Sequence, residues 1–304
     1  MKTSPKNLLI VGTGAMASLF AARLSAAGIQ VTMLGAWSEG LRALKSQGVT
    51  LIEADKSRHS YPVQATDDPS DCVGSDYALV LVKSWQTRRA AQQLKKCLSR
   101  NGVALTLQNG VGNRETLVEA LGAPRVALGV TTLGANLLEP GCVVAAGEGE
   151  IYVGVHFGID PLIEMLRRAG FKVLDAPDPD VLLWGKLIIN AAINPLTALL
   201  RVNNGELLQR PTARALMAAL AREAAAVAAA QGIRPPYDDP FAVVEEVAQR
   251  TANNRSSMLQ DVLRGTPTEV DAICGAIVRA GDQYGVPTPL NHTIWQLVKA
   301  LSPA

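Results

Sequence analysis

The sequence predicts an α/β protein of two domains, a Rossmann-type dinucleotide-binding domain followed by an all-helical domain. Three observations support this prediction. Short β-rich segments alternate with helical segments up to about Leu174, as in βαβ units of a largely parallel sheet. A glycine-rich turn directly follows the first strand. The β signal then nearly disappears after the turn-rich segment 175–180, so we place the domains at residues 1–178 and 179–304.

The first domain is expected to contain five parallel strands with helices between them. The strands are Leu8–Val11, Gln30–Leu34, Ala78–Val82, Val103–Leu107 and Val126–Val130, and the clearest helices are Ala15–Ala27, Thr87–Leu98 and Arg114–Leu121. Two stretches depart from this alternation. Val49–Glu53 and Tyr61–Gln64 flank Ala54-Asp55-Lys56 and predict a hairpin, and the glycine-containing stretch Cys142–Val155 predicts antiparallel edge strands.

The second domain is expected to be a helical bundle. Helices are predicted at Val181–Asn194, Pro211–Gln231, Phe241–Thr251, Ser257–Leu263, Pro267–Tyr284 and Pro289–Leu301, with Gly232, Gly265 and Gly285 as stop signals.

Composition excludes several classes of function. With 304 residues, of which 48% are hydrophobic, the chain is long enough for two globular cores. The net charge of +2 arises from scattered residues, which argues against a nucleic-acid partner. The longest stretch of small apolar residues, Ala215–Ala230, is interrupted by Arg222 and Glu223, so no membrane span is expected. The N-terminus is interpreted as strand, turn and helix and not as a signal peptide.

The cysteines and histidines predict neither a disulfide framework nor a metal site. Cys72, Cys97, Cys142 and Cys274 lie far apart and form no CxxC pair, which favours free thiols and a cytoplasmic location. His59, His156 and His292 lack metal-site spacing and have no obvious acidic partner. A lysine is therefore the best candidate for a proton donor.

The turn after the first strand has the pattern of a dinucleotide-binding site. In Gly12-Thr13-Gly14-Ala15-Met16-Ala17, the first glycine permits a tight turn and the second lets backbone approach a pyrophosphate. Ala17 permits close helix packing, while the helix N-terminus faces the phosphates. The alternative is a merely structural glycine turn. We expect residues 12–16 to bind the cofactor.

The end of the second strand bears on the choice between NAD and NADP. An acidic residue there typically binds the ribose of NAD, and a nearby arginine receives the 2′-phosphate of NADP. The segment Met33–Glu39 ends the strand without an acid, which argues against NAD, but it also contains no arginine. Arg42 lies half a helix further on, and Glu39 is the alternative ribose ligand. We expect NADPH.

The segment Trp184–Thr197 carries three polar residues in an otherwise apolar helix. Lys186, Asn190 and Asn194 are spaced i, i+4 and i+8, so they share one helix face. Buried lysine and asparagine side chains are costly unless they have partners. The stripe is either one wall of a polar pocket or a satisfied core network with a snorkelling lysine.

Further polar residues occupy positions where ligands bind in such folds. Lys83 follows one predicted parallel strand and Asn109 another, at the sheet edge where open α/β sheets bind ligands. A solvated loop lysine and a plain Asn-Gly turn are the alternatives. Thr266-Pro-Thr-Glu269 and Ser257-Met-Leu-Gln260 fit capping boxes, although the start at Ser257 equally suits a substrate carboxylate.

Taken together, these motifs resemble the ketopantoate reductase (2-dehydropantoate 2-reductase) family. The family's K-x3-N-x3-NP, SSMxxD and E-x-D motifs match Lys186-Asn190-Asn194-Pro195, Ser256–Asp261 and Glu269–Asp271, in order over essentially the whole chain. Two positions depart from the family pattern, because Ala17 replaces the third glycine and no arginine stands near Ala36-Trp37. Both departures concern cofactor preference more than the type of reaction.

The resemblance implies a fold whose helical domain is like the C-terminal domain of 6-phosphogluconate dehydrogenase. It also implies NADPH-dependent reduction of 2-dehydropantoate to pantoate in pantothenate and coenzyme A biosynthesis. By this resemblance Lys186 is the catalytic acid and Glu269 binds the substrate. The same mapping assigns the hydroxyl end of the substrate to Asn190 and Asn194, and its carboxylate to Ser257 and the backbone of Asn254. Asn109 is assigned to both substrate and cofactor, with Lys83 a further cofactor ligand.

Two alternatives to this function remain open. The chain is either a related reductase of another 2-keto acid, an imine or a polyol phosphate, or a dinucleotide sensor without turnover. The expected partner is a small-molecule keto acid, with no metal, nucleic acid or membrane, in a monomer or homodimer.

Overall fold

The computed structural model describes residues 8–53 and 55–301, and the chain divides into two compact units. The first unit comprises residues 1–82, 86–108 and 113–179, and the second comprises residues 83–85, 109–112 and 180–304. This division falls one residue after the predicted domain boundary. Two short loops that follow strands of the first unit are thus counted with the second.

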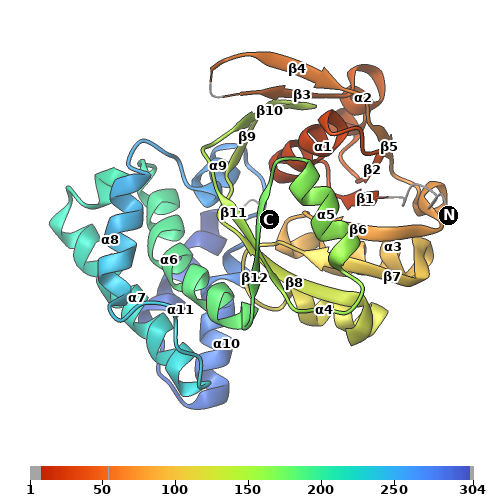
Figure 1. The fold of residues 1–304 in the computed structure, drawn as a ribbon. Coiled ribbons are helices and arrows are strands. Elements are labelled where there is room, and N and C mark those ends of the chain that lie inside the picture. The colour runs from red at the N-terminus through yellow and green to blue at the C-terminus, as the bar shows by residue number, and fades with distance from the viewer. Residues whose placement is uncertain (1–7, 54, 302–304) are drawn as a thin grey trace. The chain divides into compact units, whose positions relative to one another are not determined.

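The first unit is built on a sheet of eight strands in the described residues, ordered β12-β11-β8-β7-β6-β1-β2-β5. The strands are β1 Leu8–Val11, β2 Val31–Leu34, β5 Gln64–Thr66, β6 Ser75–Val80, β7 Leu98–Thr106, β8 Val126–Thr131, β11 Glu150–Gly154 and β12 Lys172–Ala176 (Figure 1). The segment from β5 to β8 is parallel throughout. Strand β11 pairs antiparallel with β8, and β12 pairs parallel with β11, so these two strands run opposite to the other six. In chain order this segment has the Rossmann arrangement 3-2-1-4-5-6, which reverses between β1 and β6.

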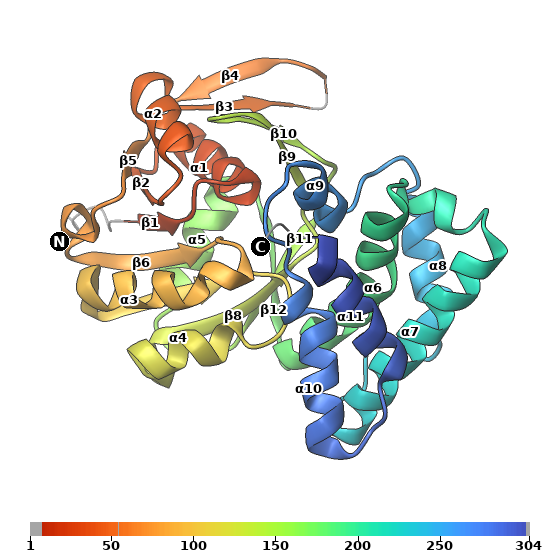
Figure 2. The same cartoon turned by 180° about the vertical axis from the view of Figure 1, so that it is seen from behind.

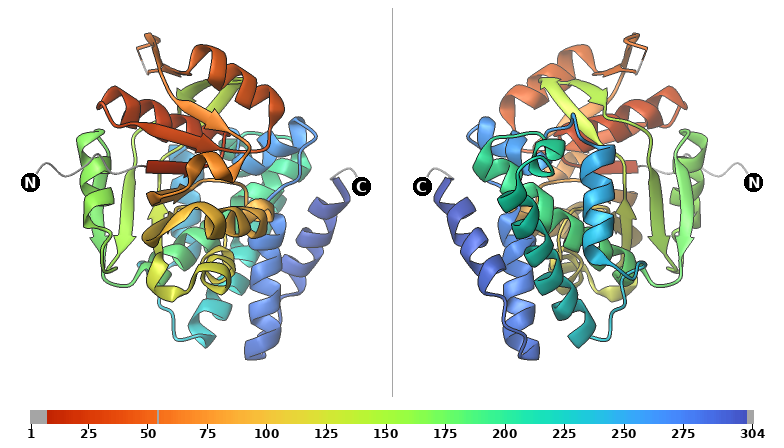
Figure 3. Two further views of the ribbon diagram at one scale, coloured as in Figure 1. Left: turned by 90° about the vertical axis from the view of Figure 1, so that its right-hand side faces the viewer. Right: turned by 90° about the vertical axis from the view of Figure 1, so that its left-hand side faces the viewer.

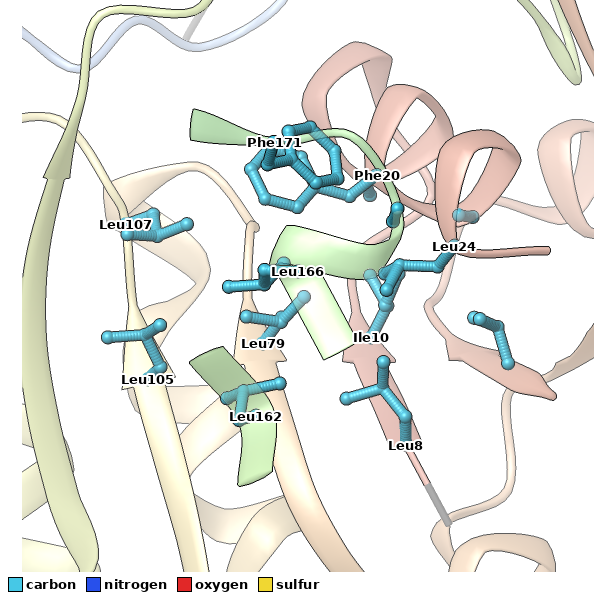
Figure 4. Close-up of a cluster of buried hydrophobic side chains, with 14 of the residues drawn as sticks. Leu8, Ile10, Phe20, Leu24, Leu79, Leu105, Leu107, Leu162, Leu166 and Phe171 are labelled. Atoms are coloured by element: carbon cyan, nitrogen blue, oxygen red, sulfur yellow. The ribbon is translucent and has the colours of Figure 1, made fainter. Parts of the chain in front are cut away.

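Helices cover both faces of this sheet. The helices are α1 Ala15–Ala26, α2 Ser38–Gln47, α3 Thr87–Cys97, α4 Asn113–Leu121 and α5 Asp160–Arg168. Helices α3 and α4 pack side by side (Figure 2). On the other face, the ring of Phe20 in α1 stacks on Phe171 at 4.4 Å, next to Leu162 and Leu166 of α5 (Figure 4).

Strand β1 contributes to two hydrophobic cores, one on each face of the sheet. Leu8 and Ile10 join the cluster under α1 and α5, whereas Leu9 and Val11 join the cluster on the opposite face. Alternate side chains of a strand point to opposite faces, so a strand covered by helices on both sides is apolar at every position. This explains the uninterrupted run Leu8–Val11.

The predicted hairpin and edge strands were only partly right. Strand β3 Val49–Ile52 pairs antiparallel with β4 Arg58–Tyr61, so the second strand begins three residues earlier than predicted. The turn residue Ala54 lies outside the described residues. In the stretch Cys142–Val155, β10 Cys142–Ala145 joins a separate sheet, of order β4-β3-β10-β9, with β9 Ala135–Glu139, and β11 joins the main sheet. The two strands therefore belong to different sheets.

The second unit consists of helices in the part of the chain that the structure describes. They are α6 Pro179–Leu200, α7 Pro211–Ala230, α8 Pro240–Arg250, α9 Ser257–Leu263, α10 Cys274–Tyr284 and α11 Pro289–Leu301, with short 3-10 turns η4 Asn204–Leu207 and η5 Val270–Ala272. Helices α10 and α11 lie side by side (Figure 3). The N-terminus of α11 is capped by Glu223 of α7, whose carboxylate accepts hydrogen bonds from the backbone amides of Leu290 and Asn291.

The predicted helix Pro267–Tyr284 was too long, and its capping box was wrong. Residues 266–269 form no helical turn, and α10 begins only at Cys274. The carboxylate of Glu269 accepts the backbone N–H of Ser84, at 3.0 Å, and not that of Thr266. The N–H of Thr266 donates to the carbonyl of Asp261 instead. A capping box therefore does not explain Glu269.

Candidate active site

The glycine turn of the first unit has the geometry that a dinucleotide site needs. Gly12 has φ of +134°, and a Cβ there would lie 3.0 Å from the carbonyl oxygen of Leu81 and 3.3 Å from Cβ of Ala17. Only glycine fits such a backbone at this separation. At Gly14 a Cβ would meet nothing within 4 Å, so the backbone is open to a ligand.

The N-terminus of α1 is equally suited to an anion. Gly14 is its N-cap residue, no side chain caps it, and its first turn contains no acidic residue. The first backbone N–H groups of a helix have no partner inside the helix, and they carry its positive dipole end. The residues predicted to bind the cofactor pyrophosphate thus fit that group.

The end of β2 explains why no acid stands there. A Cβ on Gly35 would lie 2.6 Å from Cγ2 of Thr13, so Thr13 occupies the space where a side chain would begin. Helix α2 starts at Ser38, and Glu39 and Arg42 are both exposed on it.

In the second unit, α6 presents the predicted polar stripe. It is a continuous helix through Lys186, Asn190 and Asn194, so these three residues share one face. Asn194 is 8% exposed, and Lys186 and Asn190 are partly buried. The remaining faces of the helix contribute much of the unit's apolar core. A neighbouring loop packs closely on Gly185: a Cβ there would lie 3.0 Å from Cδ of Pro236, and Tyr237 donates a hydrogen bond to the Gly185 carbonyl at 2.9 Å.

The charge on Lys186 is set by two opposing effects. Burial lowers the pKa of Lys186, and the nearby carboxylate of Glu269 raises it, with a net result of about 8. The effect of burial is the larger, because the free-energy cost of removing the ammonium from water exceeds the stabilisation that one nearby carboxylate provides. A lysine with this pKa is poised to give up a proton near neutral pH.

Glu269 is a buried carboxylate on which several predicted residues converge. It is 5% exposed. Its Oε1 accepts the backbone N–H of Ser84 at 3.0 Å, and its Oε2 lies 3.5 Å from Nδ2 of Asn109 and 3.7 Å from Nζ of Lys83. The two contacts to Oε2 are longer than usual hydrogen bonds, so this oxygen keeps acceptor capacity for a ligand.

Lys83 has a second carboxylate partner that sequence reasoning missed. Its Nζ donates to Oδ2 of Asp261 at 2.7 Å. Burial alone would lower the pKa of Lys83, but Glu269 and Asp261 more than offset it and the pKa is raised. Burial raises the pKa of Asp261, and Lys83 offsets part of that rise. Asp261 belongs to the SSMxxD motif, but the motif does not indicate its partner Lys83, which lies 178 residues away in the chain.

The start of α9 is capped one residue earlier than predicted. Oγ of Ser256 accepts the backbone N–H of Leu259 at 3.0 Å and lies 2.6 Å from Oγ1 of Thr197. Capping is therefore the role of Ser256, and Ser257 is the first residue of the helix. Asn254 is exposed, and its backbone N–H already donates to Thr251 at 2.8 Å.

Three further features of the described residues bear on function. No group of three or more His, Cys, Asp or Glu within residues 8–53 and 55–301 is arranged to hold a metal ion. The four cysteines are buried free thiols, as predicted. Helix α6 is long and apolar enough to span a membrane, and 72% of its apolar window is buried inside the structure, as in the core helix of a soluble protein.

Comparison with known proteins decides the family. A model described as ketopantoate reductase PanE/ApbA matches residues 8–157, and one described as its C-terminal part matches residues 180–302. The chain belongs to the ketopantoate reductase family. This confirms the family and fold class predicted from the sequence, and it makes the protein an oxidoreductase that uses a nicotinamide cofactor.

Individual relatives cover the chain almost completely. The 2-dehydropantoate 2-reductase of Archaeoglobus fulgidus is 39% identical over 298 residues, or 96% of each chain. A ketopantoate reductase structure from Ralstonia eutropha has a TM-score of 0.90 at 32% identity, covering 97% of this chain and 98% of that one. D-mandelate dehydrogenase, solved with NADH and anilino(oxo)acetate, also has a TM-score of 0.90, at 26% identity and 97% coverage of both chains.

Proposed function

We propose that this protein reduces 2-dehydropantoate to pantoate with NADPH, a step toward pantothenate and coenzyme A. The observation that carries the proposal is Lys186 on the polar face of α6, with its pKa lowered to about 8 by burial and raised in part by the charge of the buried Glu269 carboxylate. The relatives named 2-dehydropantoate 2-reductase support the choice of substrate. The expected location is the cytoplasm.

Residues 12–16 would hold the cofactor, with its pyrophosphate at the N-terminus of α1. NADPH supplies a hydride to the keto carbon when it is bound. We expect NADPH to be preferred over NADH because no acid stands at the end of β2. The preference should be modest, since that segment lacks an arginine and the first turn of α2 holds Glu39.

Lys186 is the proposed general acid. Negative charge develops on the ketone oxygen during reduction, and the Lys186 ammonium would stabilise that charge and donate the proton that completes the alcohol. The partial burial of Lys186 strengthens this interaction, because charges interact more strongly where water is excluded. Asn190 and Asn194 follow it along the same helix face and would hydrogen-bond the hydroxyl end of the substrate.

Glu269 is proposed to accept a hydrogen bond from the hydroxyl group of the substrate. Its Oε2 has only long contacts, of 3.5 and 3.7 Å, and so suits an added donor. Ser257 and Asn254 are proposed to meet the substrate carboxylate, with Asn254 using its side chain because its backbone N–H is already bonded. Asn109 and Lys83 would complete the site.

The similarity to D-mandelate dehydrogenase favours one alternative, the reduction of an aromatic 2-keto acid with NADH. Glu269 separates the two proposals. An aromatic 2-keto acid such as benzoylformate has no hydroxyl group, so it would leave the buried Glu269 carboxylate without that donor, at a cost in binding.

The test is steady-state oxidation of NADPH and of NADH with 2-dehydropantoate, benzoylformate and simple aliphatic 2-keto acids. The proposal expects the highest kcat/KM with 2-dehydropantoate and NADPH. A higher kcat/KM for benzoylformate would favour the alternative. Cofactor binding without oxidation, whichever keto acid is present, would indicate a sensor that has lost turnover.

A further inference from the structure

Gln108 is a buried amide whose hydrogen bonds join two separate segments of the chain. It is 8% exposed, and its Nε2 donates to the carbonyl of Val82 at 3.0 Å and to Oγ1 of Thr87 at 2.8 Å. Its Oε1 accepts from Oγ1 of Thr106 at 3.0 Å. We propose that Gln108 is a positioning residue, which fixes the two loops that meet on Glu269. The proposal deepens the function proposed above and rests on it.

The orientation of this amide is determined by its partners. The carbonyl of Val82 can only accept, so the group facing it must be the NH2. Thr87 donates its own hydroxyl hydrogen to Oδ1 of Asn113 at 2.8 Å, so its oxygen is left to accept from Gln108. Both N–H groups and the carbonyl of the amide are thereby satisfied, as buried polar groups require.

The two ends of this link are adjacent in the chain to proposed site residues. Val82 immediately precedes Lys83 and Ser84, and Gln108 immediately precedes Asn109. The bond from Gln108 to Val82 therefore fixes the separation of the two loops just before each one contributes its contacts. If the distance between Gln108 and Val82 changed by less than 1 Å, the two loops that follow them would be displaced relative to each other.

The loops converge on one carboxylate. Ser84 donates its backbone N–H to Glu269 Oε1 at 3.0 Å, while Lys83 and Asn109 approach Oε2 at 3.7 and 3.5 Å. Without the link, the loops would move independently and Glu269 would lose its fixed orientation toward the substrate hydroxyl. The effect should appear mainly in KM for the keto acid, because Lys186 belongs to a different element.

The experiment compares Q108M with T87V. Methionine keeps the approximate size of the side chain but cannot donate to Val82. Valine at position 87 also removes two buried hydrogen bonds, to Gln108 and Asn113, but it leaves the bond between Gln108 and Val82 in place. Both variants should lower the melting temperature. Only Q108M should raise KM for the keto acid, by about tenfold or more, since displacements near 1 Å have effects of this size.

Equal kinetic effects of Q108M and T87V at matched folded fractions would overturn the proposal, as would an unchanged KM in Q108M. If Q108M does not fold, Q108E carries the same prediction. Its protonated carboxyl can still donate to Val82 but its ionised form cannot, so kcat/KM relative to the wild type should fall as the pH rises. A constant ratio would contradict the proposal.

Failure of the proposed function is recognised separately. If the wild type prefers another 2-keto acid, the comparison is run with that compound. If the wild type reduces none, crystal structures of Q108M and T87V decide. The proposal then expects the distances from Ser84 N and Asn109 Nδ2 to the Glu269 carboxylate to lengthen in Q108M alone, and unchanged distances overturn it.

Discussion

The candidate sites of the two units are built from different parts of the chain, backbone in the first and side chains in the second. In the first unit the candidate cofactor site consists of backbone: a glycine at positive φ, a second glycine with open space beside it and an uncapped helix N-terminus. In the second unit the candidate site consists of ionisable side chains that neutralise one another, with the partly exposed Lys83 between the buried carboxylates of Asp261 and Glu269. A backbone site is recognisable from a short motif, whereas a side-chain site depends on contacts between distant parts of the chain.

The largest expected effect concerns the side-chain site. Lys186→Ala removes the proposed proton donor, so kcat should fall by about 10²- to 10⁴-fold. Binding of NADPH, measured by fluorescence titration, should stay nearly unchanged. Lys172→Ala is the control, because that lysine pairs with Glu150 on the surface of the first unit. A wild-type kcat in the Lys186 variant would remove this residue from the mechanism.

Glu269→Gln separates charge from shape at the same site. The amide carbonyl can still accept from Ser84, but its NH2 would face Lys83 and Asn109. Stability should therefore fall by only about 1–2 kcal/mol. The kcat/KM for the keto acid should fall by about tenfold or more, because a charged acceptor binds a hydroxyl roughly twice as strongly as a neutral one. Denaturant unfolding and steady-state kinetics measure both, and unaltered kinetics would make Glu269 a structural residue.

The two glycines provide the matching test of the backbone site. Gly12→Ala should lower stability by about 1–3 kcal/mol, because its φ of +134° strains any other residue. Gly14→Ala has room for its methyl group and should keep the melting temperature. It should nevertheless weaken NADPH binding by about tenfold, because the methyl group fills the ligand's approach. Unweakened binding in the Gly14 variant would argue against a pyrophosphate at this turn.

The smallest expected effect concerns cofactor choice. Ala36→Arg places a cation after β2, which should increase the preference for NADPH over NADH by about threefold to tenfold through a charge-assisted bond to the 2′-phosphate. The ratio of the two kcat/KM values measures it. Ala36→Met is the control of similar length without charge, and an equal change in both variants would contradict an electrostatic origin.

The sequence predicted elements, and the positions of candidate site residues on them, wherever a local pattern determines them. Gly12 follows from its place after a strand, and the stripe from Lys186 to Asn194 follows from helical spacing. Helices α2 and α5 were not specifically predicted. Strand β5 Gln64–Thr66 was not predicted either, except that Gln64 was placed at the end of the hairpin, and it pairs with β2. That pairing joins segments 32 residues apart in the chain and leaves no periodic signal.

The contacts of Glu269 show why the rest of the site was out of reach. The Thr266–Glu269 pattern fits a capping box, but the carboxylate bonds to an amide 185 residues away and faces the ammonium of Lys83. Charged and backbone partners brought in by the fold outcompete a local cap. The balance of the Lys186 pKa likewise required the burial and the distance to Glu269 that only the structure provides.

The pH dependence of kcat/KM, measured on the wild type and on Glu269→Gln, tests the central claim most directly. Lys186 donates a proton only in its ammonium form, so wild-type kcat/KM should be maximal below its pKa and fall as the pH rises through about 8. Glu269 raises that pKa, so its neutralisation should move the fall to lower pH. A wild-type profile that stays flat well above this pKa, or a fall that moves to higher pH in the variant, would contradict the assignment of Lys186 as the acid.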